Sequence, residues 1–524
     1  MLKQEENELI TRVGPGTPMG NFMREYWVPA MLSSEVPAAD SDPLRILLLG
    51  EQLIGFRDSN GNVGLLQNNC PHRGASLFFG RNEEAGLRCV YHGWKFDVEG
   101  NCIDMPNEPA ESDFRHKVKA MAYPCQERGG IVWTYMGPRK TPPPLPDLEG
   151  NMQPDSDQNV RATQLACNWL QILEGDIDTT HVGFLHYGGL KPDDQIPGSF
   201  SEYQLRVKTA HFEVIDTEGG AAYGARRPAG ADQVYWRIAQ WCFPFYTFTP
   251  PGVLGTKKGG NARVPMDDTH TMTFSMVTGR NRPGGASPLA LRQPLKPNTT
   301  DWYGRFQPEQ ELANDFLMDR EVQRNNSGPA GFTGIQGIAM QDAAMTTSMG
   351  DVLDRTIEHL GTTDAMVIRV RRRLIASVRA HMQHGVTPPG VEDPGAYRVR
   401  SGGVFLAPDA DWVEATRELR QAFVEHPEAI PYRLVAYSAE RADGTWRRYA
   451  AYPEIGCVSE AETPWEAQEQ LEEQRIRYII DHVQRGEPIP VPRPPLKSLT
   501  TVLDVERLGF ARWLVETEQL NEGE

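Results

Sequence analysis

The chain has 524 residues, and its 53 Lys and Arg stand against 70 Asp and Glu, which gives a formal net charge of −17. This length exceeds what one hydrophobic core organises, so roughly two to four domains are expected. The acidic balance and the lack of a basic block argue against a nucleic-acid partner. No apolar run is long enough to span a bilayer, and the first residues lack the apolar part of a signal peptide. Seven cysteines form a sparse, odd set that is typical of metal binding in a reducing cytoplasm, where we expect the protein to reside.

In chain order, residues 1–27 are expected to pack on the second of two large domains. From 28 to 138, short runs of β-branched and aromatic residues alternate with Gly, Asn and Pro, which predicts a small all-β domain. The proline cluster at 140–150 marks its end. Strands and helices mix from 139 to 428, which predicts an α+β domain, and the apolar periodicity at 364–385 predicts a long helix ended by a glycine.

Residues 429–495 begin a separate set of elements. Three short strands precede a helix whose start carries a capping box at Thr463 and Glu466. The sequence GEPIPVP (486–492) predicts a further strand, and a tail follows at 496–524. This βββαβ pattern resembles the HicB antitoxin fold, most clearly in YPEIGCVSEAETPWEA and GEPIPVP. Because no basic patch accompanies it, a packing or oligomerisation module is favoured over DNA binding or catalysis.

Two loops of the all-β domain, CPHRG and CVYHGWKF, each carry one cysteine and one histidine. Four such ligands suit a structural zinc ion, or a [2Fe–2S] cluster with cysteines on one iron and histidines on the other. Zinc fingers usually pair their cysteines on one knuckle, whereas here each loop supplies one ligand of each type, which favours the cluster. Gly74 and Gly93 are expected to permit tight turns, and Trp94 to shield the site. The ligands are Cys70, His72, Cys89 and His92.

A second candidate metal site lies in CNWLQILEGDIDTTHVGFLH. On a regular helix Glu174, Asp178 and His181 share one face. His186 lies about 140° round from His181, so both histidines reach one metal only if the helix ends or distorts between them, which Gly183 permits. Two histidines and a carboxylate form the facial triad of non-haem Fe(II) oxygenases. The alternative is a pair of packed helix histidines.

The third ligand of such a triad must come from elsewhere in the chain. Asp342 stands early in an apolar stretch, where an unpaired charge is costly, and it is the predicted ligand. Asp351, Asp354 and Glu358 are expected to be solvated helix charges.

Together these motifs resemble the oxygenase components of Rieske non-haem iron oxygenases, in the phthalate-dioxygenase-like branch that includes aromatic O-demethylases. The matching stretches are LITRVGPGTPMGNFMREYWVPA, the two Cys/His loops, NWLQILEGDIDTTHVGFLH, and GIAMQDAAM followed by MGDVLDRTIEHLG. The resemblance implies a Rieske domain on a helix-grip catalytic domain, with one [2Fe–2S] cluster and one mononuclear Fe(II) per subunit.

The resemblance also implies a homotrimer or a dimer of trimers, in which the cluster of one subunit faces the iron of the next. Asp178 matches a carboxylate that bridges His181 of its own chain and the partner subunit's His92. Asn168 matches an asparagine near the iron. Both are expected to take part in catalysis.

The implied function is that of a terminal oxygenase, which uses O2 and electrons from NAD(P)H to hydroxylate or O-demethylate an aromatic, carboxylated compound. No G-x-G-x-x-G follows a strand, so the electrons must come through a separate reductase, possibly with a ferredoxin. The alternatives are a cis-dihydroxylating dioxygenase of the phthalate type, a non-catalytic Rieske electron carrier and an iron–sulfur sensor.

Arginine forks suit carboxylates, and the catalytic domain carries several arginines in its strand-rich part. Arg206 and Arg237 are the candidate substrate contacts. Arg226 and Arg227, in ARRP, are read as part of a surface loop.

Overall fold

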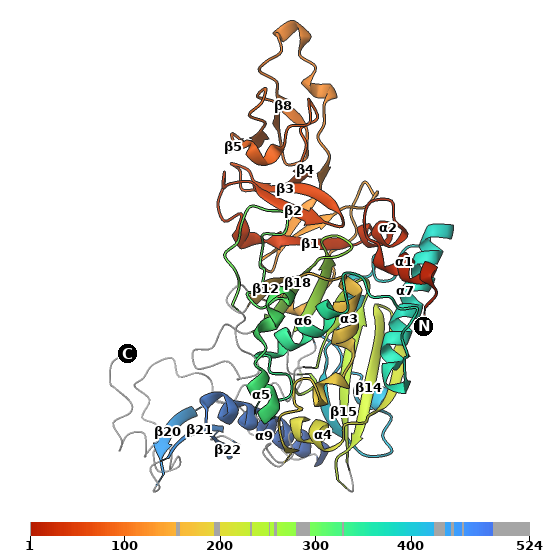
Figure 1. The fold of residues 1–524 in the computed structure, drawn as a ribbon, viewed down its shortest axis with the longest axis vertical. Coiled ribbons are helices and arrows are strands. Elements are labelled where there is room, and N and C mark those ends of the chain that lie inside the picture. The colour runs from red at the N-terminus through yellow and green to blue at the C-terminus, as the bar shows by residue number, and fades with distance from the viewer. Residues whose placement is uncertain are drawn as a thin grey trace. The chain divides into compact units, whose positions relative to one another are not determined.

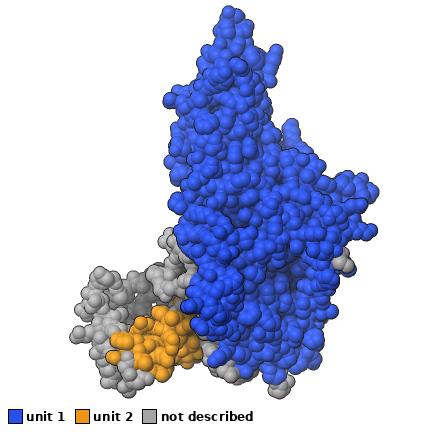
Figure 2. Space-filling view, viewed as in Figure 1, with its two compact units in different colours: residues 1–282, 288–424 blue, residues 283–287, 425–524 orange. Residues whose placement is uncertain are grey.

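A computed structural model of the chain describes residues 2–153, 158–192, 200–230, 233–250, 252–255, 259–278, 294–326, 328, 330–423, 435–441, 445–452 and 455–485. The chain divides into two compact units (Figure 2): unit 1 comprises Met1–Arg282 and Pro288–Val424, and unit 2 comprises Pro283–Ser287 and Glu425–Glu524. The boundary predicted at 428, the strand predicted at 486–492 and the tail at 496–524 lie outside the described residues.

The first part of unit 1 is built from β-strands, as predicted. Its strands are β1 (Trp27–Leu32), β2 (Leu44–Leu48), β3 (Glu51–Arg57), β4 (Val63–Gln67), β5 (Arg81–Glu83), β6 (Gly86–Arg88), β7 (Lys95–Phe96), β8 (Cys102–Asp104), β9 (Ala122–Tyr123), β10 (Cys125–Arg128) and β11 (Ile131–Tyr135). They form three antiparallel sheets with the orders β1–β11–β10, β2–β3–β4–β9 and β5–β6–β7–β8.

The second part of unit 1 is organised by an antiparallel sheet with the order β12–β18–β17–β16–β15–β14–β13, and β19 pairs with β15. Its strands are β12 (Gln158–Leu165), β13 (His211–Asp216), β14 (Gly220–Pro228), β15 (Val234–Cys242), β16 (Tyr246–Phe248), β17 (Gly259–Pro265), β18 (Thr271–Thr278) and β19 (Gly402–Leu406).

Helices surround this sheet in Figure 1, where α3 and α6 lie near β12 and β18 and α7 runs along β14. The helices of unit 1 are α1 (Gln4–Thr11), α2 (Pro18–Arg24), α3 (Trp169–Ile177), α4 (Phe200–Arg206), α5 (Arg320–Asn325), α6 (Ile338–Ser348), α7 (Ala365–His384) and α8 (Trp412–Ala415). The sheet β5–β8 lies at the end of unit 1 away from α3 and α6 (Figure 1).

Helix α7 shows why the sequence pattern was informative. Met366, Val370, Leu374 and Val378 recur at helical spacing, and all four are buried in the core beside the sheet. Gly385 ends the helix with a φ of 63°, a left-handed conformation that glycine adopts without strain. The predicted helix is therefore confirmed.

Unit 2 contains the antiparallel sheet β20–β21–β22 and one helix. The elements are β20 (Val435–Glu440), β21 (Trp446–Tyr452), β22 (Cys457–Ala461) and α9 (Pro464–Arg485). The predicted capping box is present, because Glu466 N donates to Thr463 Oγ1 at 3.2 Å and Thr463 N donates to Glu466 Oε2 at 3.1 Å. Ala467, Leu471 and Ile479 of α9 are buried against the sheet.

Candidate metal centres

Two loops of the β5–β8 region have the same backbone geometry. In the first, Cys70 N donates to Ala75 O at 2.8 Å and Gly74 N donates to Cys70 O at 2.9 Å. In the second, the corresponding bonds join Cys89 to Trp94 at 2.8 Å and Gly93 to Cys89 at 2.9 Å. Gly74 and Gly93 have φ values of 76° and 81°, so each glycine permits the turn, as predicted.

The matched loops bring the four predicted cluster ligands to one place. The His72 and His92 ring centroids lie 4.5 Å apart, and Trp94 stacks on His72 at 4.3 Å. Cys70 and Cys89 are each 3% exposed, and burial raises the pKa of the Cys70 thiol to about 11. A metal that binds here must therefore displace the thiol proton. One cysteine and one histidine per loop can hold a two-iron cluster with unlike ligands on its two irons.

The second candidate site is built where α3 ends. The helix ends at Ile177, because the Asp178 backbone is extended and the Asp178 carboxylate accepts bonds from N and Oγ1 of Thr180, both at 2.7 Å. A 3₁₀ turn, η6 (His181–Gly183), follows. The expectation that Asp178 and His181 share a helix face is wrong, since a capped turn joins them. The helix was expected to end or distort between His181 and His186, and it ends earlier, at Ile177.

This turn and α6 bring two histidines and a carboxylate together. His181 Nε2 lies 3.2 Å from His186 Nε2, and Asp342 Oδ1 lies 3.5 Å from the former nitrogen and 3.2 Å from the latter. Each residue offers one ligand atom, and these atoms lie within 4.8 Å of one another. The set can hold one metal ion and leaves positions open to other ligands.

Each histidine of this triad has a second partner. His181 Nδ1 lies 3.1 Å from Asp178 Oδ2, and His186 Nδ1 lies 2.8 Å from Gln341 Oε1. Burial works against ionisation of Asp178, but hydrogen bonds from His181 and Thr180 outweigh it and hold the pKa of Asp178 below its usual range. Burial likewise opposes protonation of His181, yet its hydrogen bond to Asp178 raises the pKa.

The Asp342 side chain is 43% exposed, which differs from its expected burial in an apolar stretch. It opens on a cavity of about 710 Å3 that runs along α3 and α6 on the side of β12, β17 and β18. Asp178 and His181 also line this cavity. Ligands can therefore approach the triad from the side of these helices.

Helix α3 is fixed by a buried ion cluster. Glu174 pairs with Arg355 and with Arg371, and Arg371 pairs in turn with Glu358. Arg355, which has no exposed surface, also donates to Asn7 Oδ1 at 3.2 Å. Although burial alone would raise the pKa of Glu174, the two guanidinium groups lower it. The prediction that Glu358 is a solvated helix charge is wrong, since residues 349–361 form no helix and its carboxylate is needed by a buried arginine.

We expect Glu174→Gln to destabilise unit 1 by about 3–5 kcal/mol, because it leaves a buried guanidinium without a charge partner. Calorimetric melting measures the loss as a lower Tm. The matched control is Glu414→Gln, which removes an ion pair with Arg417 in which both side chains are 64% exposed, and which should change stability by less than about 1 kcal/mol. Equal effects of the two substitutions would contradict the anchoring role.

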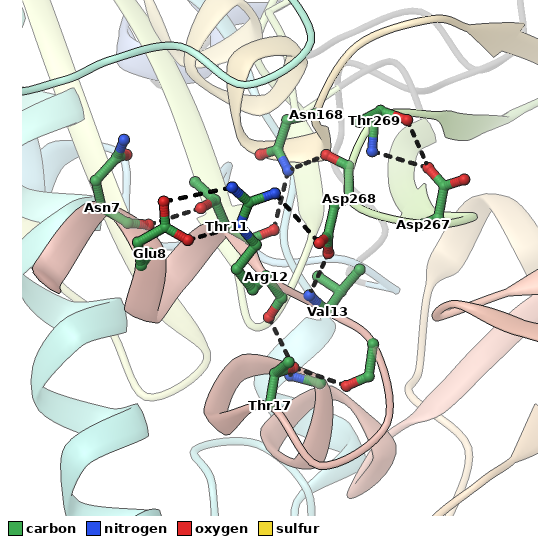
Figure 3. A network of polar contacts seen from close by, with 12 residues as sticks. Asn7, Glu8, Thr11, Arg12, Val13, Thr17, Asn168, Asp267, Asp268 and Thr269 are labelled. Atoms are coloured by element: carbon green, nitrogen blue, oxygen red, sulfur yellow. Dashed lines mark hydrogen bonds and ion pairs between the residues drawn. The ribbon is translucent and has the colours of Figure 1, made fainter. Parts of the chain in front are cut away.

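The structure places Asn168 at the N-terminus of α3 (Figure 3). Its Oδ1 accepts from Leu170 N at 3.2 Å, and its Nδ2 donates to the carbonyls of Thr11 and Asp268 at 3.0 and 2.8 Å. The nine-residue helix, which is roughly 14 Å long, lies between this amide and Asp178. Asn168 therefore joins α3 to the N-terminal segment, at the end of the helix opposite His181.

The arginines that the sequence analysis named have different surroundings. Arg206 is 47% exposed and pairs with Glu202 one turn earlier in α4. Arg226 and Arg227 belong to β14, so the prediction of a loop there is wrong. Arg227 is 2% exposed, and its Nη1 has no acceptor among the described residues, as is also true of Arg237 Nε.

Arg227 and Arg237 lie on one face of the sheet, because Arg227 pairs with Tyr235, two residues before Arg237. Burial lowers the pKa of the Arg227 guanidinium. The positive charge of Arg237 opposes protonation of His181, although the pKa of His181 is raised overall. The sequence pattern predicted a surface loop for Arg227, because its burial depends on the pairing of β14 with its neighbouring strands.

A two-histidine, one-carboxylate triad in a chain with a Cys₂His₂ cluster domain defines the class of Rieske oxygenases. The Rieske [2Fe-2S] domain model matches residues 26–124, and the model of the LigXa C-terminal domain matches residues 134–430. The chain belongs to the family of Rieske non-haem iron oxygenases, whose cofactors are a [2Fe–2S] cluster and a mononuclear iron.

Three curated relatives illustrate this membership. The 3-chlorobenzoate-3,4-dioxygenase oxygenase subunit of Comamonas testosteroni is 44% identical over 81% of this chain and 100% of its own length. The phthalate 4,5-dioxygenase oxygenase subunit of Pseudomonas putida is 38% identical over 79% and 94%. The 5,5'-dehydrodivanillate O-demethylase oxygenase subunit of Sphingobium sp. is 30% identical over 75% and 84%. Among the described residues, no helix combines the length and apolar character required to cross a membrane.

Proposed function

We propose that this chain is the oxygenase subunit of a multicomponent system that hydroxylates or O-demethylates an aromatic carboxylate. The observation that carries the proposal is the triad of His181, His186 and Asp342 at the end of α3. These residues would hold the mononuclear iron, and that iron supplies O2 activation when bound. The phthalate-type alternative, cis-dihydroxylation, uses the same site, and the relatives include both dioxygenases and a demethylase.

The second iron site follows from the two matched loops. We assign Cys70 and Cys89 to one iron of the cluster and His72 and His92 to the other. The buried thiols and the less buried imidazoles support this division, because the histidine side is the one that an electron donor or acceptor can approach. Electrons would come from NAD(P)H through a separate reductase, possibly with a ferredoxin, in the cytoplasm.

The substrate carboxylate is assigned to Arg227 and Arg237. Their buried guanidinium atoms without acceptors are costly unless an anion satisfies them. Arg237 lies within electrostatic reach of His181, and Arg227 lies within reach of Asp178, which is the partner of His181.

We expect Arg227→Met and Arg237→Met each to raise the KM for an aromatic acid by about 10–100-fold, because each removes a charge-assisted hydrogen bond. Initial rates with a series of benzoates and their uncharged methyl esters measure the effect. Arg206→Met is the matched control and should leave KM unchanged, since Arg206 pairs with Glu202. Substrate assignment to these arginines fails if esters and acids are used equally well.

We further propose that the active form is a homotrimer or a dimer of trimers. The cluster loops lie in the part of unit 1 away from α3 and α6 (Figure 1), which supports the proposal that a partner subunit's cluster supplies the triad. Val90 and Tyr91, beside His92, are 58% and 56% exposed and available for such a contact. Asp178 lines the open cavity and would receive the partner subunit's His92.

Unit 2 is proposed to be a HicB-like accessory module for packing or oligomerisation. Its three-stranded antiparallel sheet with one packed helix supports this reading. The family model ends at residue 430, and the Comamonas testosteroni relative is covered over its full length by 81% of this chain. The strands and the helix of this module thus come after the residues that the family model matches.

A further inference from the structure

The residue before Asp342 contacts the other side of the metal triad. Gln341 is 1% exposed, and its Oε1 lies 2.8 Å from His186 Nδ1. Its Nε2 donates to Thr333 Oγ1 at 3.2 Å and to Ile335 O at 3.0 Å. Consecutive residues of α6 therefore reach the same histidine: Asp342 approaches Nε2, and Gln341 approaches Nδ1.

The hydrogen-bond chemistry fixes the orientation of the Gln341 amide. A backbone carbonyl only accepts, so the group that faces Ile335 O must be the Nε2 donor. Oε1 then faces His186, where it can only accept. His186 consequently carries a hydrogen on Nδ1, and in the neutral imidazole its Nε2 keeps a lone pair directed at His181 and Asp342.

The two histidines of the triad thus have unlike partners. His181 is held by the Asp178 carboxylate, whose side chain is 24% exposed, whereas His186 is held by a neutral amide inside the core. A neutral acceptor orients the ring without adding a second negative charge beside the metal.

We propose that Gln341 is the positioning residue that keeps His186 in its metal-binding tautomer and ring orientation. The proposal rests on the function proposed above, in which His186 is an iron ligand. The competing explanation is that Gln341 merely ties α6 to residues 333–335. Only the positioning role predicts a change in metal affinity that is separate from the change in stability.

The experiment measures Fe(II) affinity anaerobically, by competition with a chromogenic chelator, in protein that retains its Rieske cluster. Gln341→Met keeps the side-chain length without its hydrogen bonds, and we expect Fe(II) to bind about 10–100-fold more weakly. The matched control is Gln171→Met. Gln171 is also 1% exposed, and it bonds to Thr346 O and Gly350 O without contacting the triad. This control should lower Tm comparably and leave the affinity within about twofold of wild type.

Gln341→Glu separates the two roles further. It keeps an acceptor for His186, but its second oxygen faces the Ile335 carbonyl. We expect a Tm at or below that of Gln341→Met, together with an affinity nearer to wild type. The proposal is overturned if Gln341→Met binds Fe(II) as tightly as wild type, or if Gln171→Met loses as much affinity. A different result, equal affinity of His186→Ala and wild type, would instead refute the metal site itself.

Discussion

Replacing Asp342 by Ala is expected to reduce turnover to below about one-thousandth of the wild-type rate and to leave the Rieske spectrum intact. Among the described residues, Asp342 supplies the carboxylate of the triad with His181 and His186. Its loss leaves two neutral imidazole ligands and removes the negatively charged ligand of the iron. The cluster loops belong to another sheet and do not depend on it. The measurement is substrate consumption with a competent reductase, alongside the visible and EPR spectra of the cluster.

A matched control is Asp354→Ala. Asp354 lies close in sequence, but it is exposed and its carboxylate bonds to Thr356 of its own turn. This variant should turn over at the wild-type rate. If Asp342→Ala remained active, the third iron ligand would have to be another carboxylate, and the triad would be wrongly assigned.

The second large effect is expected for Asp178→Asn. Asparagine keeps the shape and can still accept from Thr180, but it removes the charge that holds His181 and, in the proposed trimer, the partner subunit's His92. Both metals should therefore bind, whereas steady-state turnover should fall by about 10–100-fold, the size of effect expected when an orienting group is lost. Rapid mixing of the reduced protein with substrate and O2 should show slow oxidation of the cluster.

Asp176→Asn is the matched control, because Asp176 lies two residues earlier, in the last turn of α3, and pairs with Arg263. It should lower stability without slowing cluster oxidation. Mixed trimers give an independent check. Chains with Cys89→Ala and chains with His181→Ala are each inactive alone, yet mixing them should restore part of the activity if electrons cross between subunits. No restoration would indicate transfer within one chain.

The local features of both sites could be predicted from the sequence. The cluster loops are short hairpins with glycines at fixed positions, so spacing alone brings Cys70, His72, Cys89 and His92 together. The pair His181 and His186 could also be recognised, together with the need for a break in the helix. Asp342 was chosen from the sequence as the third ligand because it stands in an apolar stretch. The structure places its carboxylate beside both histidines, but its side chain is 43% exposed.

Features that depend on tertiary pairing could not be predicted. Gln341 is an ordinary helix residue in sequence. Its amide faces His186 only because Thr333 and Ile335 accept hydrogen bonds from its Nε2. Arg227 lies in a Gly- and Ala-rich stretch that has weak strand propensity, but pairing with β15 on one side and β13 on the other makes it a central strand. Glu358 lacks any local sign of burial, because its partner Arg371 is on α7.

The buried ion pairs of Glu174 join residues that are far apart in the sequence, and this separation sets an order of assembly during synthesis. All strands of the cluster domain are present once β11 has been made, and β11 pairs with β1. Helix α3, by contrast, cannot be fixed until Arg355 and Arg371 have left the ribosome. At ordinary elongation rates these events are separated by on the order of ten seconds or more. The strands that carry the cluster loops are therefore available for pairing while the ion pairs that fix α3, beside the mononuclear site, are still incomplete.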